Sequence, residues 1–240
     1  MNTLYRQLPK FALLFFVTFM LFSACQKPMF NPKSAEYSPI IELQTTKGNL
    51  QIQLYASTPK HRDNFVELVK EGYYNGLLFH RVIANFMIQG GDPESKEAKA
   101  GESLGMGGPG YQIDAELGIN ADSSLNHIHL KGRIAAARQG GIGNPLKKSS
   151  GSQFYVVQGQ KVEEDFLQKV ENIRKFKYSE EQKKAYLEKG GTPHLDADYT
   201  VFGELVDGEE VLDAISNAPC DQMDRPVQDV RIIKAVIVKG

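Results

Sequence analysis

Short stretches in which apolar and polar residues alternate recur along the chain from residue 40 onwards. The first two, residues 40–45 and 50–55, flank Lys47-Gly48-Asn49, whose turn-forming residues predict a β-hairpin. Six further runs predict strands at residues 76–82, 86–89, 132–138, 153–157, 200–206 and 230–238. Eight short strands favour a mainly β fold, a closed eight-stranded antiparallel β-barrel, because closure removes the sheet edges at which chains aggregate.

Two helices are predicted to cap this barrel. The first begins at Thr58-Pro59, because a threonine side chain can cap a helix and proline suits the first helical turn. It ends near Gly72, since glycine readily adopts the left-handed conformation that closes many helices. The second covers residues 209–217, between the last two predicted strands.

A third helical stretch, residues 162–188, interrupts the strand pattern. Its first half has apolar residues at steps of three and four, namely Phe166, Val170, Ile173 and Phe176. The sequence Ser179-Glu180-Glu181-Gln182 then matches a capping box, which predicts that a second helix begins there. We therefore expect a helical hairpin inserted at about residues 160–193, with its charged residues forming a solvated face.

The N-terminus has the pattern of an export signal rather than of a folded domain. Arg6 and Lys10 precede an apolar run of twelve residues, 11–22, and the small residues Ser23-Ala24 follow it. Twelve residues are too few for a membrane-spanning helix, which needs about 20. A basic start, a short apolar centre and a small-residue exit predict a secretory signal over residues 1–24.

The segment Phe22-Ser23-Ala24-Cys25 resembles a bacterial lipobox, in which the cysteine is acylated and becomes the mature N-terminus. This resemblance implies a lipoprotein signal peptide and lipid attachment at Cys25; the alternative is an ordinary signal peptide beside an incidental cysteine. Residues 25–38 are polar and proline-containing, which predicts a tether before a domain at 39–240. Because Gln26 rather than an aspartate follows the cysteine, the expected location is the bacterial cell envelope, anchored in the outer membrane and facing the periplasm.

Charge and cysteine content narrow the function classes. The 240 residues include 28 basic and 29 acidic ones, a net charge of −1, so the chain lacks the basic surplus typical of nucleic-acid-binding domains. Acylation of Cys25 would leave only Cys220, so no intrachain disulfide is expected. His127 and His129 lie two residues apart, but two ligands are fewer than a zinc site needs, and no metal is predicted.

Chemically versatile residues concentrate in the stretch 79–92, FHRVIANFMIQGGD, which spans two adjacent predicted strands. Alternation along a strand places Arg81 and its next-but-one neighbours on one face. A partly buried guanidinium there needs acceptors, and the neutral amides of Gln89 and Gln153 could orient it without cancelling its charge. These residues by themselves leave two interpretations open, a functional arginine or a surface arginine held by a carboxylate.

The stretch 79–92 resembles the signature of the cyclophilin family of peptidyl-prolyl cis–trans isomerases, and three further blocks follow in the family's order. These blocks are IAAAR at 134–138, GSQFY at 151–155, and LD at 195–196 followed by YTVFG at 199–203. The resemblance covers about residues 40–240 apart from the helical insertion. Four blocks in this order argue against a chance match.

The resemblance implies a role for each matching residue. Arg81 and Gln89 would be catalytic, with Arg81 stabilising the twisted prolyl amide over an apolar proline pocket. Substrate contacts would come from Phe86, Met87, Ala137, Arg138, Gln153, Tyr155, His194, Leu195 and Tyr199. Four of these depart from the family's commonest residues, a difference that bears on substrate preference more than on catalysis: Arg138, Tyr155, His194 and Tyr199.

The implied function is isomerisation of X-Pro peptide bonds, which assists the folding of exported proteins. The expected partners are proline-containing polypeptides and, through the lipid anchor, the membrane. No nucleic acid and no cofactor are expected, and a small closed barrel can act as a monomer. The alternative is a proline-recognising chaperone or assembly module with little catalytic activity. Arg81 separates the two, because a module that only binds proline could lose it.

Overall fold

The structure is a computed structural model that describes residues 36–239. The predicted signal at 1–24, the predicted lipidation site Cys25 and the predicted tether up to residue 35 lie outside the described residues. Between residues 36 and 239, no helix is both long enough and apolar enough to span a membrane.

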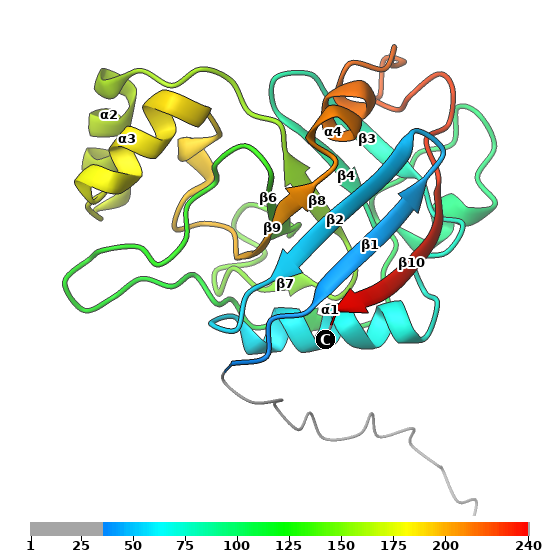
Figure 1. Cartoon of the computed structure of the whole chain (residues 1–240), viewed down its shortest axis with the longest axis horizontal. Helices are drawn as coiled ribbons and strands as arrows, with labels where there is room; N and C mark the ends of the chain where they lie inside the picture. Colours follow the sequence, from blue (N-terminus) through cyan, green and yellow to red (C-terminus); the bar gives the residue numbers. More distant parts are fainter. Residues whose placement is uncertain (1–35, 240) are drawn as a thin grey trace, which may run out of the picture. The chain divides into compact units, whose positions relative to one another are not determined.

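Eight antiparallel strands form one sheet that curves into a half-barrel (Figure 1). Their order across the sheet is β10-β1-β2-β9-β6-β8-β4-β3. The strands are β1 (Ile40–Thr45), β2 (Gly48–Leu54), β3 (Phe79–Ile83), β4 (Met87–Gly90), β6 (Arg133–Ala136), β8 (Phe154–Val157), β9 (Val201–Asp207) and β10 (Ile232–Lys239). All eight predicted strands are confirmed with ends shifted by a few residues, because alternating burial along a strand leaves its period in the sequence.

The predicted closure of the barrel is not realised as a continuous ladder. β3 and β10 end the strand order and are not paired as strands. The residues just before the two strands approach each other at an isolated bridge between Leu78 and Arg231. A 2.9 Å hydrogen bond runs there from the Phe79 amide to the Val230 carbonyl. Two more backbone hydrogen bonds join this stretch to β10, from the Gly76 amide to the Ile232 carbonyl at 2.7 Å and from the Ile232 amide to the Leu77 carbonyl at 2.8 Å. Residues 71–76 form the turn that follows the first helix, so the pairing ends there and the sheet is not closed by a strand pair at this seam.

Two short strands, β5 (Gln112–Ile113) and β7 (Ser149–Ser150), were not predicted. They pair with each other in a separate two-stranded sheet, within connections for which the sequence predicted no strand. Two residues are too few to show a periodicity, so no pattern could have revealed them. Their pairing ties the long connection after β4 to the segment that leads into β8.

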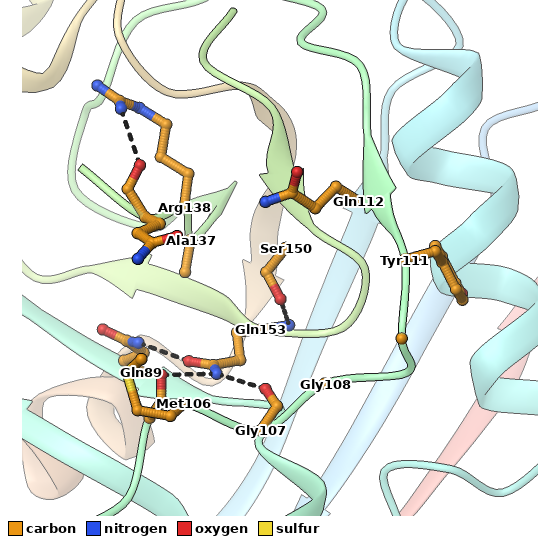
Figure 2. Close-up of a pocket in the computed structure, with 13 residues that line it drawn as sticks. Gln89, Met106, Gly107, Gly108, Tyr111, Gln112, Ala137, Arg138, Ser150 and Gln153 are labelled. Atoms are coloured by element: carbon orange, nitrogen blue, oxygen red, sulfur yellow. Dashed lines mark hydrogen bonds between the residues drawn. The ribbon is translucent and has the colours of Figure 1, made fainter. Parts of the chain in front are cut away.

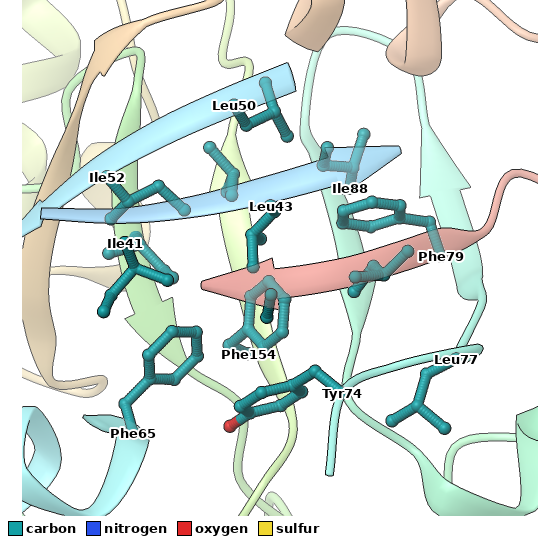
Figure 3. Packing of buried hydrophobic residues seen from close by; sticks show 14 of the residues in the cluster. Ile41, Leu43, Leu50, Ile52, Phe65, Tyr74, Leu77, Phe79, Ile88 and Phe154 are labelled. Atoms are coloured by element: carbon teal, nitrogen blue, oxygen red, sulfur yellow. The ribbon is translucent and has the colours of Figure 1, made fainter. Parts of the chain in front are cut away.

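The main core lies inside the curve of the sheet (Figure 3). Its aliphatic part includes the fully buried inward side chains of Ile41, Leu43, Leu50 and Ile52. Its aromatic part centres on Phe154, whose ring meets those of Phe65 and Tyr74 edge-on at centroid distances of 5.4 and 5.6 Å. Such edge-to-face pairs add to the stabilisation from burial. Since Phe154 lies between Gln153 and Tyr155, this packing fixes the strand that carries two predicted site residues.

Helices α1 (Pro59–Lys70) and α4 (Glu209–Ser216) cover opposite ends of the half-barrel (Figure 1). Both agree with the predicted capping helices. Thr58 occupies the cap position of α1, but its hydroxyl donates to the Tyr55 carbonyl at 3.4 Å instead of accepting from a helix amide. Gly72, with a φ of 68°, follows the end of α1 in the left-handed conformation that favours glycine.

Helices α2 (Glu164–Arg174) and α3 (Glu180–Lys189) form the inserted hairpin between β8 and β9 (Figure 1). The predicted capping box is confirmed, because Ser179 Oγ accepts a hydrogen bond from the Gln182 amide at 3.2 Å. The predicted apolar stripe of the first helix is wrong in part, since Phe166 and Ile173 are 38% and 74% exposed. The hairpin core comprises Leu125, Ile128, Leu130, Val162, Leu167, Val170, Phe176, Tyr178, Tyr186 and Ala197.

The stripe was misplaced because a charged residue takes a buried position on α2. The buried side chains of this helix are Leu167, Val170 and Glu171. The Glu171 carboxylate accepts a hydrogen bond from the Tyr178 amide at 2.8 Å, which compensates for its burial. A pattern built only from apolar residues cannot include such a position.

Candidate active site

Beside β3, β4 and β8 lies a cavity of about 120 Å³, called the apolar pocket below. Nine predicted site residues line it: Arg81, Phe86, Met87, Gln89, Ala137, Arg138, Tyr155, Leu195 and Tyr199. Of the two others in the described chain, His194 stacks on Phe86 at a ring-centroid distance of 5.7 Å, and Gln153 contacts Gln89. The structure therefore brings all of these residues together.

The floor of the apolar pocket consists of strand side chains that point away from the main core. Met87 on β4 pairs with Val157 on β8 in an antiparallel register. Because successive side chains of a strand point to opposite faces, Ile88 enters the main core while Met87 and Tyr155 face the pocket. The result is a small apolar site that can enclose a compact ring.

Arg81 lies at the rim of this pocket, with its side chain 43% exposed. It pairs with Gln89 across the β3–β4 ladder. Among the described residues, its one carboxylate contact is with Asp224, whose Oδ2 lies 3.5 Å from the arginine Nε. Its terminal nitrogens make no hydrogen bond within residues 36–239. Arg81 therefore differs from a surface arginine held firmly by a carboxylate, and its donors remain available to a bound molecule.

The amide of Gln153 has a fixed orientation beside Gln89 (Figure 2). Its Nε2 donates to the carbonyls of Gly105 and Gly107 at 2.9 and 2.8 Å, and its Oε1 accepts from Gln89 Nε2 at 3.0 Å. Gln89 thus uses one of its two N–H donors on Gln153 and keeps its amide oxygen as an acceptor. Both amides are neutral, so they orient groups near Arg81 without cancelling its charge.

The glycine-rich loop that carries these carbonyls is held by a buried carboxylate. Asp92 is fully buried and accepts hydrogen bonds from the amides of Glu94, Gly105 and Gly107. A Cβ atom on Gly107 would lie 2.1 Å from Asp92 Oδ1, so the loop can approach the carboxylate only with glycine at that position. Asp92 therefore supports the site, although it does not line the apolar pocket itself.

A larger groove of about 570 Å³, called the polar groove, adjoins the apolar pocket (Figure 2). The two share Gln89, Ala137 and Arg138. The other residues lining the groove are Gly105, Met106, Gly107, Gly108, Gly110, Tyr111, Gln112, Gln139, Ser150 and Gln153. Because the two cavities share these wall residues, they lie next to each other, and an extended peptide that enters the pocket with one side chain would have the groove beside its neighbouring residues.

One wall of the apolar pocket consists of three residues that depart from the family's commonest types, namely Arg138, Tyr155 and Tyr199. The Arg138 guanidinium lies 4.6 Å from the centre of the Tyr199 ring, and its Nε donates to the Asp198 carbonyl at 2.8 Å. The Tyr155 hydroxyl, which needed a partner, has one in His129 Nε2 at 3.0 Å. Burial raises the pKa of the Tyr155 hydroxyl well above its usual range, so it stays protonated.

His80 lies behind Arg81 and is only 4% exposed. Within the described part of the chain, neither of its ring nitrogens has a hydrogen-bond partner. Burial lowers the pKa of its imidazole to about 4, against the opposing attraction of the Asp92 carboxylate. His80 is therefore neutral near pH 7 and adds no second positive charge beside Arg81.

Three further residues near the site received no role from the sequence. Asp92 holds the glycine loop, Asp224 lies near the Arg81 guanidinium, and His129 hydrogen-bonds to Tyr155. Asp92 closes the stretch 79–92, so that motif contained a signal for this carboxylate. His129 was noted only as half of a histidine pair with too few ligands for zinc, and no pattern indicated Asp224. In residues 36–239, no group of three or more His, Cys, Asp or Glu side chains is arranged to hold a metal.

Comparison with known proteins agrees with this geometry. Residues 40–237 match the family described as cyclophilin type peptidyl-prolyl cis-trans isomerase/CLD. The chain is 35% identical over 213 residues to putative peptidyl-prolyl cis-trans isomerases of Staphylococcus aureus and Staphylococcus epidermidis, covering 88% of this chain and 98% of each relative.

Solved structures of a Cryptosporidium parvum cyclophilin-type isomerase resemble this fold. One is 26% identical with a TM-score of 0.58, covering 85% of this chain and 99% of that one. The other, determined in the presence of the dipeptide Ala-Pro, is 26% identical with a TM-score of 0.56, covering 84% and 99%.

Proposed function

Because this chain belongs to the cyclophilin-type peptidyl-prolyl cis–trans isomerases, and is thus an enzyme of that class, we propose that Arg81 carries its catalysis. The apolar pocket holds the proline ring, and the guanidinium stabilises the twisted prolyl amide. The observation that supports this assignment most directly is the position of Arg81 at the pocket rim with its terminal nitrogens unused within the described chain.

The residue type suits the reaction. An X-Pro bond isomerises slowly because rotation breaks the resonance of the amide. In the twisted state the proline nitrogen regains a lone pair, which can accept a hydrogen bond that the planar amide cannot. A donor from Arg81 therefore binds the transition state more strongly than the ground state, which is the condition for catalysis.

One hydrogen bond does not supply the whole acceleration. A hundred-thousand-fold increase in rate corresponds to about 7 kcal/mol, whereas a hydrogen bond to a charged group contributes about 1.5–3 kcal/mol. The rest must come from positioning and water exclusion in the pocket. Gln89 contributes to positioning, since it lies opposite Arg81 in the ladder and keeps a free amide oxygen.

Proline-containing polypeptides are the proposed substrates. A neighbour of the same fold was studied with Ala-Pro, and the adjoining polar groove of this chain can take the residues that flank the proline. Assistance to exported proteins is the proposed role, with a proline-recognising chaperone of little catalytic activity as the alternative. We propose that the enzyme acts as a monomer.

A refolding experiment separates catalysis from binding alone. Wild-type protein is expected to accelerate, at substoichiometric amounts, the refolding of a substrate protein whose slow phase is limited by prolyl isomerisation. The Arg81→Ala variant should lose this acceleration while still binding a proline-containing peptide. Equal acceleration by both proteins would favour the chaperone alternative, because that role does not need the guanidinium.

We propose further that Cys25 is acylated and holds the domain at the outer membrane on the periplasmic side. The Cys25→Ala variant, expressed in a bacterium that processes lipoproteins, is expected to move from the membrane fraction to the soluble fraction. Cys220→Ala is the matched control, since it removes the other cysteine and should leave the protein in the membrane fraction. A Cys25→Ala protein that stays with the membrane would contradict lipid attachment at this residue.

A further inference from the structure

We propose that the inserted hairpin is a positioning element of the apolar pocket, acting through Tyr178, Tyr186 and the buried carboxylate of Asp196. The role rests on the proposed function, since the pocket must hold a proline ring for its shape to matter. The contacts involved are called the Asp196 network and join Asp196, His129, Tyr155, Tyr178 and Tyr186.

Asp196 is fully buried and receives hydrogen bonds on both oxygens. Its Oδ2 accepts from the hydroxyls of Tyr178 and Tyr186, each at 2.6 Å. Its Oδ1 accepts from the backbone amide and from Nδ1 of His129, at 2.9 and 2.6 Å. Burial and the nearby Asp196 carboxylate raise the pKa of both tyrosine hydroxyls, so they remain donors. The hairpin therefore supplies two of the four hydrogen bonds that compensate this buried carboxylate.

From Asp196 the network continues to the pocket wall. His129 Nδ1 donates to Asp196, and His129 Nε2 lies 3.0 Å from the Tyr155 hydroxyl oxygen, so the imidazole hydrogen-bonds to both groups. The rings of His129 and Tyr155 are nearly parallel, with an interplanar angle of 11°. Tyr155 lines the apolar pocket. The hydroxyl that distinguishes Tyr155 from the phenylalanine commoner in the family is the atom that makes this link.

The same carboxylate also anchors a second wall of the pocket. Asp196 directly follows the 3-10 turn Pro193–Leu195, and Leu195 lines the pocket. Arg174, at the end of α2, donates to the His194 carbonyl at 3.0 Å, and its guanidinium pairs with the Asp198 carboxylate. The hairpin therefore contacts this turn from two sides, through the tyrosine hydroxyls and through Arg174.

Attachment of the hairpin alone would not need these hydroxyls. Its core already buries the side chains of Leu167, Val170 and Phe176. Tyr178 and Tyr186 belong to the same core, so replacing them with phenylalanine keeps the rings and removes only the hydrogen bonds of the two hydroxyls. These are the bonds to Asp196, a 3.4 Å bond from the Tyr178 hydroxyl to the Pro193 carbonyl, and a 3.0 Å bond that the Tyr186 hydroxyl accepts from the His129 amide. A positioning role therefore predicts a loss of activity that a loss of stability does not explain.

The experiment compares the Tyr178→Phe/Tyr186→Phe double variant with Ser179→Ala. The control removes the capping hydroxyl of α3 and leaves every side chain of the Asp196 network in place. The kcat/KM for an X-Pro peptide is measured well below the Tm of each protein, and the hydrogen-bonded imidazole N–H resonance of His129 is followed by NMR. We expect the double variant to lose about tenfold in kcat/KM and to shift this resonance. Ser179→Ala should lower the Tm without either change.

Two results would overturn the proposal. One is a double variant with kcat/KM within twofold of wild type, because the hydroxyls would then serve stability alone. The other is an equal loss in Ser179→Ala, because activity would then follow the stability of the hairpin. If the double variant does not fold, Tyr178→Phe alone supports the same comparison, with an expected loss of about threefold. If the proposed role of Arg81 were wrong, Arg81→Ala would keep its activity, and the kcat/KM of each hairpin variant relative to wild type would be unaffected.

Discussion

Replacing Arg81 with alanine is expected to lower kcat/KM for an X-Pro peptide about 100-fold, a loss typical of removing one donor to a transition state. The fold should persist, because the Arg81 side chain is 43% exposed and its ion pair with Asp224 is long. Surface ion pairs of this kind contribute at most about 1 kcal/mol to stability. A protease-coupled isomerisation assay measures the activity, and thermal unfolding of both proteins measures stability.

Asp224→Asn is the matched control for this variant. It removes the one carboxylate near Arg81 in the described chain and keeps the guanidinium. Asparagine also tolerates the backbone φ of 63° at this position. Its kcat/KM should stay within about threefold of wild type, since a surface ion pair contributes little. Near-normal turnover by a folded Arg81→Ala protein would refute the proposed mechanism, and an equal loss in Asp224→Asn would assign the effect to the ion pair.

Gly91→Ala is expected to lower the free energy of unfolding by about 4 kcal/mol, a combination of backbone strain and overpacking. Gly91 has a φ of 91°, which side-chain-bearing residues rarely adopt. An added Cβ would lie 2.2 Å from the Ser152 carbonyl oxygen and 2.9 Å from Gln153 Cα. Both are backbone atoms that cannot rotate away. Since Gln153 orients Gln89, activity should fall together with stability.

Gly101→Ala isolates the steric part of this effect. Gly101 has a similar φ of 83°, but no atom lies within 4 Å of the position that a Cβ would occupy. Only the strain of the left-handed backbone should remain, about 1 kcal/mol. Urea unfolding curves for both variants give the difference. If the two variants were equally destabilised, the close approach of the chain at Gly91 would not be the cause.

The strands and helices could be predicted because their signals are local. Apolar and polar residues alternate at 40–45 and 50–55 because one face of the sheet packs against the core. The capping box at Ser179 involves only residues that are close in sequence. The candidate site came from the resemblance of four short motifs to the family, and the structure places Arg81 opposite Gln89 on adjacent strands. Residues assigned from different motifs, such as Tyr155 and Leu195, do line one pocket.

What remained unpredicted depends on contacts between distant parts of the chain. The seam between β3 and β10 depends on where the chain turns before Leu78. The exposure of Ile173 depends on Glu171, which takes a buried position on the same helix and bonds to a backbone amide. The link from the hairpin to Tyr155 joins residues up to 67 positions apart.

The sequence by itself therefore determined the strand set and the inserted hairpin, because periodicity and capping motifs record local geometry, and its resemblance to the family implied the residues of the pocket. Only the tertiary structure decided that Asp92 holds the glycine loop and that Asp196 joins the hairpin to the pocket. The physical reason is that a buried carboxylate must find donors wherever the fold brings them, and their positions in the sequence follow no period.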